Sequence, residues 1–148
     1  MVLIFAAIAA WAADPFYFGT WKVASAVVAP WADPAVRQPD SAEMKSLVGK
    51  MVVIRANEIT GPHAVACKGP RYKVVEYPAD MLFQGAFDEM RRRDKSVNPE
   101  KLAAKLGFRG SKWKTLETGC GNEIDYHFAD ANTAEFGLND FVYTLKKQ

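Results

Sequence analysis

The sequence predicts a mainly β domain with a minor α+β component: an antiparallel β-barrel or strongly curved meander sheet with two or three short helices. Three observations lead to this prediction. Several segments alternate apolar and polar residues with the two-residue period of a strand. Pro, Gly, Asn and Asp separate these segments as turn residues. In the last third of the chain, strand-like segments follow one another with short connections, which is typical of antiparallel neighbours.

The first predicted strand covers residues 19–29, a run rich in valine and alanine that a proline ends. Asp40 or Ser41 is expected to cap a short helix over residues 42–47, because both side chains accept hydrogen bonds from free backbone N–H groups. Residues 51–54 are then expected to form a second, compact strand.

The middle of the chain alternates between strand and helix signals. Residues 72–77 are typical of a strand, and Pro78 directly after them suits the first turn of a helix. A clearer helix is predicted to begin at Asn98 as its cap, with Pro99 in its first turn, and to end at Gly107.

The last third of the sequence predicts strands over residues 112–118, 122–129, 134–138 and 141–145. In the second of these, apolar and polar side chains should lie on opposite faces: Ile124, Tyr126 and Phe128 against Glu123, Asp125 and His127. A half-solvated antiparallel sheet places the apolar set in the core and the charged set in water. A barrel with a polar lumen reverses that assignment, and the sequence leaves both open.

Residues 1–13 form an uncharged apolar run that ends in small residues, which is typical of a secretory signal peptide, although no Lys or Arg precedes it. Cleavage after Ala12 or Ala13 leaves residues 14–148 as a single domain. We therefore expect a periplasmic or secreted protein with no stable membrane insertion after cleavage. The alternative is that the run forms a strand or buried helix of the folded domain.

Export decides how Cys67 and Cys120 are interpreted, because the thiols of exported proteins tend to pair. We predict that these two residues form a disulfide. A zinc site is the sharper alternative, since His63 and His127 would complete a tetrahedral set, but the spacings fit none of the compact zinc motifs. A free catalytic thiol is a further alternative. We expect neither a metal nor a cofactor.

The net charge of +2 is small and spread along the chain, so composition predicts neither a nucleic-acid partner nor a role at a membrane surface. The basic run over residues 91–95 has acidic neighbours and no interleaved aromatic residues. We expect this run to be a solvated loop. The protein is expected to be a monomer.

The Gly19-Thr20-Trp21 motif at the first strand resembles the corresponding motif of small lipocalin-like (calycin) barrels. The resemblance implies that Trp21 packs across the bottom of a barrel against a basic residue from a late strand, with Lys146 or Lys147 as the partner. The helix-rich region over residues 80–106 departs from that family, and its second motif, around a Thr-Asp pair, is not evident.

Three further segments, over residues 67–70, 77–83 and 116–120, resemble segments of uncharacterised bacterial exported proteins. This second resemblance implies a bacterial periplasmic protein, and it implies no activity.

Catalytic motifs such as a nucleophile elbow, a phosphate-binding Gly-rich loop or a metalloprotease helix are absent from the sequence. Aromatic side chains are better functional candidates, because strand aromatics that face a barrel interior bind apolar or flat ligands. The expected ligand-binding residues are Trp21, Trp31, Tyr72, Tyr77, Trp113, Tyr126, Phe128 and Tyr143. An ordinary packed core is the alternative for this set.

The leading hypothesis is therefore a non-enzymatic exported binding protein for a small apolar or aromatic molecule or for a protein. A second is an inhibitor or immunity-type protein that reaches its target through the loop over residues 91–98 or the turn between Gly61 and Gly69. A third is an enzyme that uses His127 with Asp125 or Glu117, but we assign no catalytic residue.

Overall fold

The computed structural model describes residues 13–148. The predicted signal peptide, apart from Ala13, lies outside these described residues. Along the described part of the chain, no helix combines the length and the apolar character that crossing a membrane requires.

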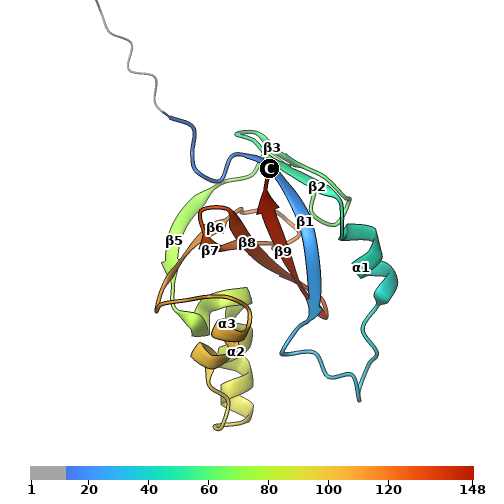
Figure 1. The fold of residues 1–148 in the computed structure, drawn as a ribbon, viewed down its shortest axis with the longest axis vertical. Helices are drawn as coiled ribbons and strands as arrows, with labels where there is room; N and C mark the ends of the chain where they lie inside the picture. Colours follow the sequence, from blue (N-terminus) through green and yellow to red (C-terminus); the bar gives the residue numbers. More distant parts are fainter. Residues whose placement is uncertain (1–12) are drawn as a thin grey trace, which may run out of the picture.

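Within residues 13–148 the main element is a nine-stranded antiparallel sheet that curls into a half-barrel, so the mainly β fold is confirmed (Figure 1). Its strands pair in the order β4-β3-β2-β1-β9-β8-β7-β6-β5, which makes the first and last strands of the chain neighbours. The strands are β1 (Gly19–Val28), β2 (Met51–Ile54), β3 (Glu58–Thr60), β4 (Cys67–Lys68), β5 (Lys73–Tyr77), β6 (Trp113–Glu117), β7 (Tyr126–Asp130), β8 (Thr133–Leu138) and β9 (Phe141–Lys147).

The helices are short, and two of them begin at the caps that the sequence predicts. In α1 (Ser41–Leu47), the Asp40 side chain accepts hydrogen bonds from the first backbone N–H groups. In α3 (Pro99–Lys105), the Asn98 side chain accepts one from Lys101 N–H. Both predicted caps are confirmed. Between them lie the 3₁₀ turn η1 (Ala79–Met81) and α2 (Leu82–Arg93).

Helix α2 corrects the prediction for the basic run over residues 91–95. Arg91 to Arg93 form the last turn of α2 and not a loop. Arg92 pairs with Asp88 at 2.8 Å and Arg93 pairs with Glu89 at 2.9 Å, one helical turn earlier in each case. These pairs and the favourable position of cations at a helix C-terminus extend the helix through a charged segment.

The predicted strand over residues 122–129 begins later than expected, because residues 122–125 form a loop before β7. Asn122 Oδ1 accepts a hydrogen bond from Ile124 N–H at 3.1 Å, and Glu123 adopts a left-handed φ of 58°. This local turn replaces strand pairing at the start of the segment. The expected alternation of charged and apolar faces therefore applies only from Tyr126 onward.

Two hydrophobic clusters occupy the two faces of the sheet. In β9, Phe141, Tyr143 and Leu145 belong to the interior cluster inside the half-barrel, whereas Val142 belongs to a cluster shared with α2 and α3. We call these the interior cluster and the helix-side cluster. Of the two assignments that the sequence leaves open for the polar face of β7, neither describes His127, which is 1% exposed and lies on the helix side.

The disulfide between Cys67 and Cys120 is present, as predicted. Cys67 lies on β4, at one end of the strand order, and Cys120 follows β6, beside the other end. Hydrogen bonds cross the same seam, from Asn122 Nδ2 to Ala64 O at 3.1 Å and from the Tyr72 hydroxyl to Arg55 O at 2.8 Å. The disulfide thus joins the two ends of the curled sheet. Because the two sulfur atoms are bonded to each other, neither cysteine is available as a metal ligand or a nucleophile.

Trp21 lies against a basic residue of the last strand. Its side chain is fully buried, and Lys147 Nζ lies 5.3 Å from the centre of its ring. Lys147 Nζ also donates a hydrogen bond to Phe16 O at 2.6 Å. Lys146 instead donates to Thr133 Oγ1 on β8, so Lys147 is the partner of Trp21.

We predict that replacing both cysteines, Cys67→Ser with Cys120→Ser, lowers the free energy of unfolding by up to about 4 kcal/mol, because the disulfide closes a loop with a sequence separation of 53. Urea unfolding at equilibrium measures the change. Val36→Ser, at an 83% exposed position, is the control and should leave the midpoint unchanged. A double variant as stable as the native chain would contradict a role of this bond in holding the sheet closed.

Candidate functional site

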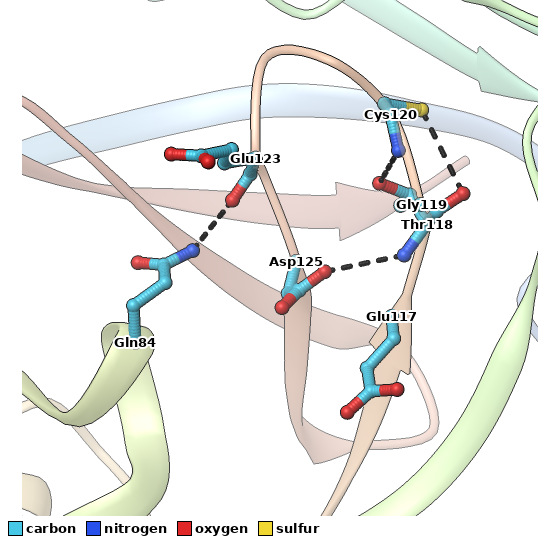
Figure 2. Close-up of a pocket in the computed structure, with 7 residues that line it drawn as sticks. All are labelled: Gln84, Glu117, Thr118, Gly119, Cys120, Glu123 and Asp125. Carbon is cyan, nitrogen blue, oxygen red and sulfur yellow. Dashed lines mark hydrogen bonds between the residues drawn. The ribbon is translucent and has the colours of Figure 1, made fainter.

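A cleft lies between the start of α2 and the loop that joins β6 to β7 (Figure 2). It has a volume of about 490 Å³ and is lined by Gln84, Glu117, Thr118, Gly119, Cys120, Glu123 and Asp125. A second cleft of about 390 Å³ shares Gln84 and Asp125 and extends along Tyr77, Asp80, Met81, Gly85 and Asp88. We call the two together the acidic cleft, because carboxylates recur along both.

One wall of the acidic cleft is a left-handed turn at the start of α2. Phe83, Gln84 and Gly85 have φ values of 52°, 54° and 76°. This conformation costs a non-glycine residue about 1–2 kcal/mol, so contacts elsewhere must hold it. Phe83 N–H donates a hydrogen bond to His127 Nε2 at 2.9 Å, and Gln84 Nε2 donates one to Glu123 O at 2.6 Å. The turn is therefore pinned to β7 and to the loop before it.

His127 is a structural partner of this turn. Because its Nε2 accepts from Phe83 N–H, its Nδ1 carries the proton and donates it to Thr115 Oγ1 at 2.8 Å. Burial lowers the pKa of His127 to about 3, so the ring is neutral. Both ring nitrogens are occupied by groups other than carboxylates. The structure does not bring His127 into hydrogen-bond contact with Asp125 or Glu123.

Asp125 lies half-buried in the acidic cleft. Burial raises its pKa, the hydrogen bond from Thr118 N–H at 3.2 Å opposes the rise, and the nearby Glu117 carboxylate adds to it. The Tyr77 hydroxyl donates a hydrogen bond to Glu117 Oε1, which raises the pKa of Tyr77 to about 12. The Glu117 carboxylate thus disfavours the charged form of Asp125 in this part of the cleft.

The cations near the acidic cleft are at its margins. Arg91 pairs with Asp88 at 2.6 Å and with Asp80 at 3.5 Å, and Lys73 approaches Glu117 at 4.0 Å. Among residues 13–148, Asp125 and Glu123 form no ion pair. The carboxylates nearest the β6–β7 loop are therefore left without a counter-ion from the described chain.

The predicted ligand-binding aromatics are distributed over separate parts of the molecule. Trp21, Tyr126, Phe128 and Tyr143 all lie in the interior cluster and are at most 5% exposed. Stacked and edge-to-face contacts, such as Phe136 with Tyr143 at 5.1 Å, fill the space between them. Tyr72 lies at the seam of the sheet, and Trp113 belongs to the helix-side cluster. Tyr77 is the member of the set that lines the acidic cleft.

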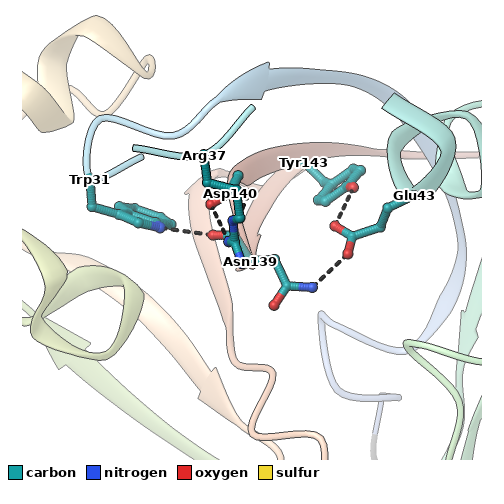
Figure 3. A network of polar contacts seen from close by, with 6 residues as sticks. All are labelled: Trp31, Arg37, Glu43, Asn139, Asp140 and Tyr143. Atoms are coloured by element: carbon teal, nitrogen blue, oxygen red, sulfur yellow. Dashed lines mark hydrogen bonds and ion pairs between the residues drawn. The ribbon is translucent and has the colours of Figure 1, made fainter. Parts of the chain in front are cut away.

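Trp31 belongs to a polar network around the β8–β9 turn (Figure 3). Its Nε1 donates to Asn139 O at 2.9 Å, while Arg37 pairs with both oxygens of Asp140 at 2.7 and 2.8 Å. Glu43 of α1 accepts hydrogen bonds from Asn139 Nδ2 at 2.5 Å and from the Tyr143 hydroxyl at 3.1 Å. These contacts fix the connection between β1 and α1, and they explain Trp31 as an anchor of that connection.

A row of polar side chains crosses the helix-side face of the sheet behind His127. The strand register places Thr115 opposite His127, His127 opposite Glu135, and Glu135 opposite Thr144. Glu135 is 4% exposed, and its Oε2 has no hydrogen-bond partner within residues 13–148. Burial raises the pKa of Glu135 to about 8, while the Thr144 hydroxyl and Lys146 act in the opposite direction. Glu135 is thus a largely protonated acid at neutral pH.

Sequence reasoning named Glu117, Glu123, Asp125 and Tyr77 and gave no role to other lining residues, above all Gln84 and Asp88. A usable signal was present. Residues 77–83 and 116–120, two segments already singled out in the sequence, both contribute to the acidic cleft. Their convergence depends on the sheet, which places β5 beside β6.

Comparison with known proteins adds no assignment to the cleft, because no family model, no curated protein and no solved structure matches the chain. The geometry and charge of the described residues therefore carry the functional argument.

We predict that Glu135→Gln changes how stability depends on pH. The folded-state pKa of about 8 lies above the ordinary value of 4.5, so the native chain loses stability as pH rises from 4.5 through 8. The slope is at most about 1.4 kcal/mol per pH unit. The variant lacks this loss, and its stability relative to the native chain should rise between pH 5 and pH 8. Thermal unfolding across this range measures the change.

Glu76→Gln is the matched control for this experiment, because Glu76 is exposed on the edge strand β5. It should leave the stability profile parallel to that of the native chain. Parallel profiles for Glu135→Gln as well would contradict the assignment of a buried, protonated carboxyl group.

Proposed function

We propose that the chain is an exported, non-enzymatic binding protein whose acidic cleft takes an arginine-bearing segment of a protein partner. The single observation that carries this proposal is Asp125. It is a half-buried carboxylate beside a second carboxylate, Glu117, and it has no ion-pair partner in the described chain. The disulfide agrees with the oxidising compartment that export implies.

A cation in the acidic cleft would relieve two unfavourable effects at once. Burial and the nearby Glu117 both disfavour the charged form of Asp125. A bound cation offsets both, and its attraction is stronger in a partly desolvated cleft than in bulk water. In the free protein the charged form of Asp125 is therefore electrostatically unfavourable, and a bound cationic partner removes this penalty.

The geometry favours a guanidinium over a bare metal ion. A cleft of about 490 Å³ is far larger than a single ion requires. Among the residues that the structure describes, no group of three or more His, Cys, Asp or Glu side chains is placed to hold a metal. Arginine is planar, always charged and carries five N–H donors, so one side chain can reach several carboxylates of the cleft.

The same site supports binding over catalysis. His127 lies behind the left-handed turn with both ring nitrogens engaged, and the cysteine thiols are joined to each other. The acidic cleft keeps carboxylates and one tyrosine as its ionisable groups from the described chain. This agrees with the expected inhibitor or immunity-type role, in which a protein covers part of a basic target. The turn between Gly61 and Gly69 lies beside the cleft, because Cys67 is bonded to Cys120.

A hexa-arginine peptide is the probe that tests this proposal, with hexa-lysine for comparison. In calorimetric titrations at low salt, we expect the double variant Asp125→Asn with Glu123→Gln to weaken binding of hexa-arginine at least tenfold. Glu76→Gln with Glu100→Gln removes the same charge at exposed positions outside the cleft and should change the affinity less than threefold. Equal losses for the two double variants, or no binding to the native chain, would overturn the proposal.

Affinity for hexa-arginine should also depend on pH. The charged form of Asp125 binds, and its raised pKa means that protonation begins at a higher pH than for an ordinary aspartate. Binding should weaken as pH falls through that pKa. In Asp125→Asn this part of the pH dependence should be missing, which separates Asp125 from the other carboxylates.

A further inference from the structure

A separate cavity of about 300 Å³ lies on the opposite face of β6 and β7 from the acidic cleft. It is lined by Phe16, Lys114, Phe128, Asp130 and Ala131. Side chains alternate along a strand. Lys114 and Phe128 therefore point to the interior face, whereas Thr115 and His127 point to the helix side. The two sites thus lie on opposite faces of the same strands and share no lining residue.

The wall of this cavity is aromatic and held in place. Phe16 packs edge-to-face on Phe128 with ring centres 4.9 Å apart, and Phe128 packs on the buried Trp21 at 5.7 Å. The backbone of Phe16 is fixed by the hydrogen bond from Lys147 Nζ. A flat apolar group therefore meets a preformed surface, which lowers the ordering cost of binding.

Two side chains of opposite charge, Lys114 and Asp130, lie beside these aromatic rings. Lys114 Nζ lies 5.0 Å from the centre of the Phe16 ring. Within residues 13–148 neither Lys114 nor Asp130 forms an ion pair. One oxygen of Asp130 accepts a hydrogen bond from Asn132 N–H at 2.8 Å. The cavity thus combines an aromatic surface with one available ammonium and one available carboxylate.

We infer that this cavity binds a free aromatic α-amino acid. The carboxylate of the ligand pairs with Lys114, its ammonium group pairs with Asp130, and its ring packs against Phe16 and Phe128. A ligand with only one charge would leave one of the two side chains without a partner. A volume of about 300 Å³ suits a molecule of this size and excludes a long lipid chain.

L-Phenylalanine is the probe for this site. Two related molecules serve as comparisons, because each carries only one of its two charged groups. 3-Phenylpropionate has only the carboxylate, and phenethylamine has only the ammonium. Titration followed by two-dimensional NMR measures affinity and shows which residues respond. We expect L-phenylalanine to bind more tightly than either comparison, with shifts at Phe16, Lys114, Phe128 and Asp130.

Variants separate the two charges. Lys114→Met should weaken binding of L-phenylalanine and 3-phenylpropionate at least fivefold and leave the affinity for phenethylamine unchanged. Asp130→Asn should weaken binding of L-phenylalanine and phenethylamine and leave the affinity for 3-phenylpropionate unchanged. Lys105→Met, on the exposed face of α3, is the matched control and should change none of the three affinities.

The inference is overturned if L-phenylalanine fails to bind at millimolar concentration, if Lys114→Met binds it as well as the native chain does, or if the shifts fall in the acidic cleft. Because Lys114 and Asp130 are both exposed, the variants are expected to keep the fold, and unchanged unfolding temperatures check this. Loss of L-phenylalanine binding in these variants with hexa-arginine binding intact would confirm that the two sites are separate.

Discussion

The structure depends on joining the two ends of an open sheet. A nine-stranded antiparallel sheet within residues 13–148 has two edge strands, β4 and β5, and an unprotected edge offers free backbone groups to other chains. The Cys67–Cys120 bond links the β4 edge to the end of β6, next to β5. Curling the sheet in this way creates an inside, which aromatic rings fill, and it places the β6–β7 loop where the acidic cleft forms.

Strand β7 supports both the acidic cleft and the aromatic cavity. Successive residues of the strand serve different faces: Tyr126 and Phe128 fill the interior, while His127 supports the left-handed turn at the start of α2. The turn stores conformational strain at the wall of the acidic cleft, and such strain persists only where surrounding contacts fix it. A neutral, fully buried imidazole is suited to this task because it accepts one hydrogen bond and donates another without carrying charge.

The fold could be predicted from the sequence to the extent that local signals decide it. The caps Asp40 and Asn98 act on their own helices, so both helix starts follow from nearby residues. The left-handed turn could not be predicted, because Phe83 adopts it for a hydrogen bond to a histidine 44 positions away. The late start of β7 has a local cause that the apolar–polar alternation of the segment conceals, since the side chain of Asn122 competes with strand pairing.

The candidate site was predicted only in part, because sequence reasoning placed ligand binding inside the barrel. Composition gives the number of aromatic rings but not whether they leave space between them, and here they pack against one another in the interior cluster. Whole-chain charge misleads in the same way. A net charge of +2 conceals carboxylates gathered in one cleft and a lysine beside an aromatic cavity on the other face of the same strands. Ligand recognition depends on the local electrostatic potential within each site, and the two sites have separate potentials because they lie on opposite faces of one sheet.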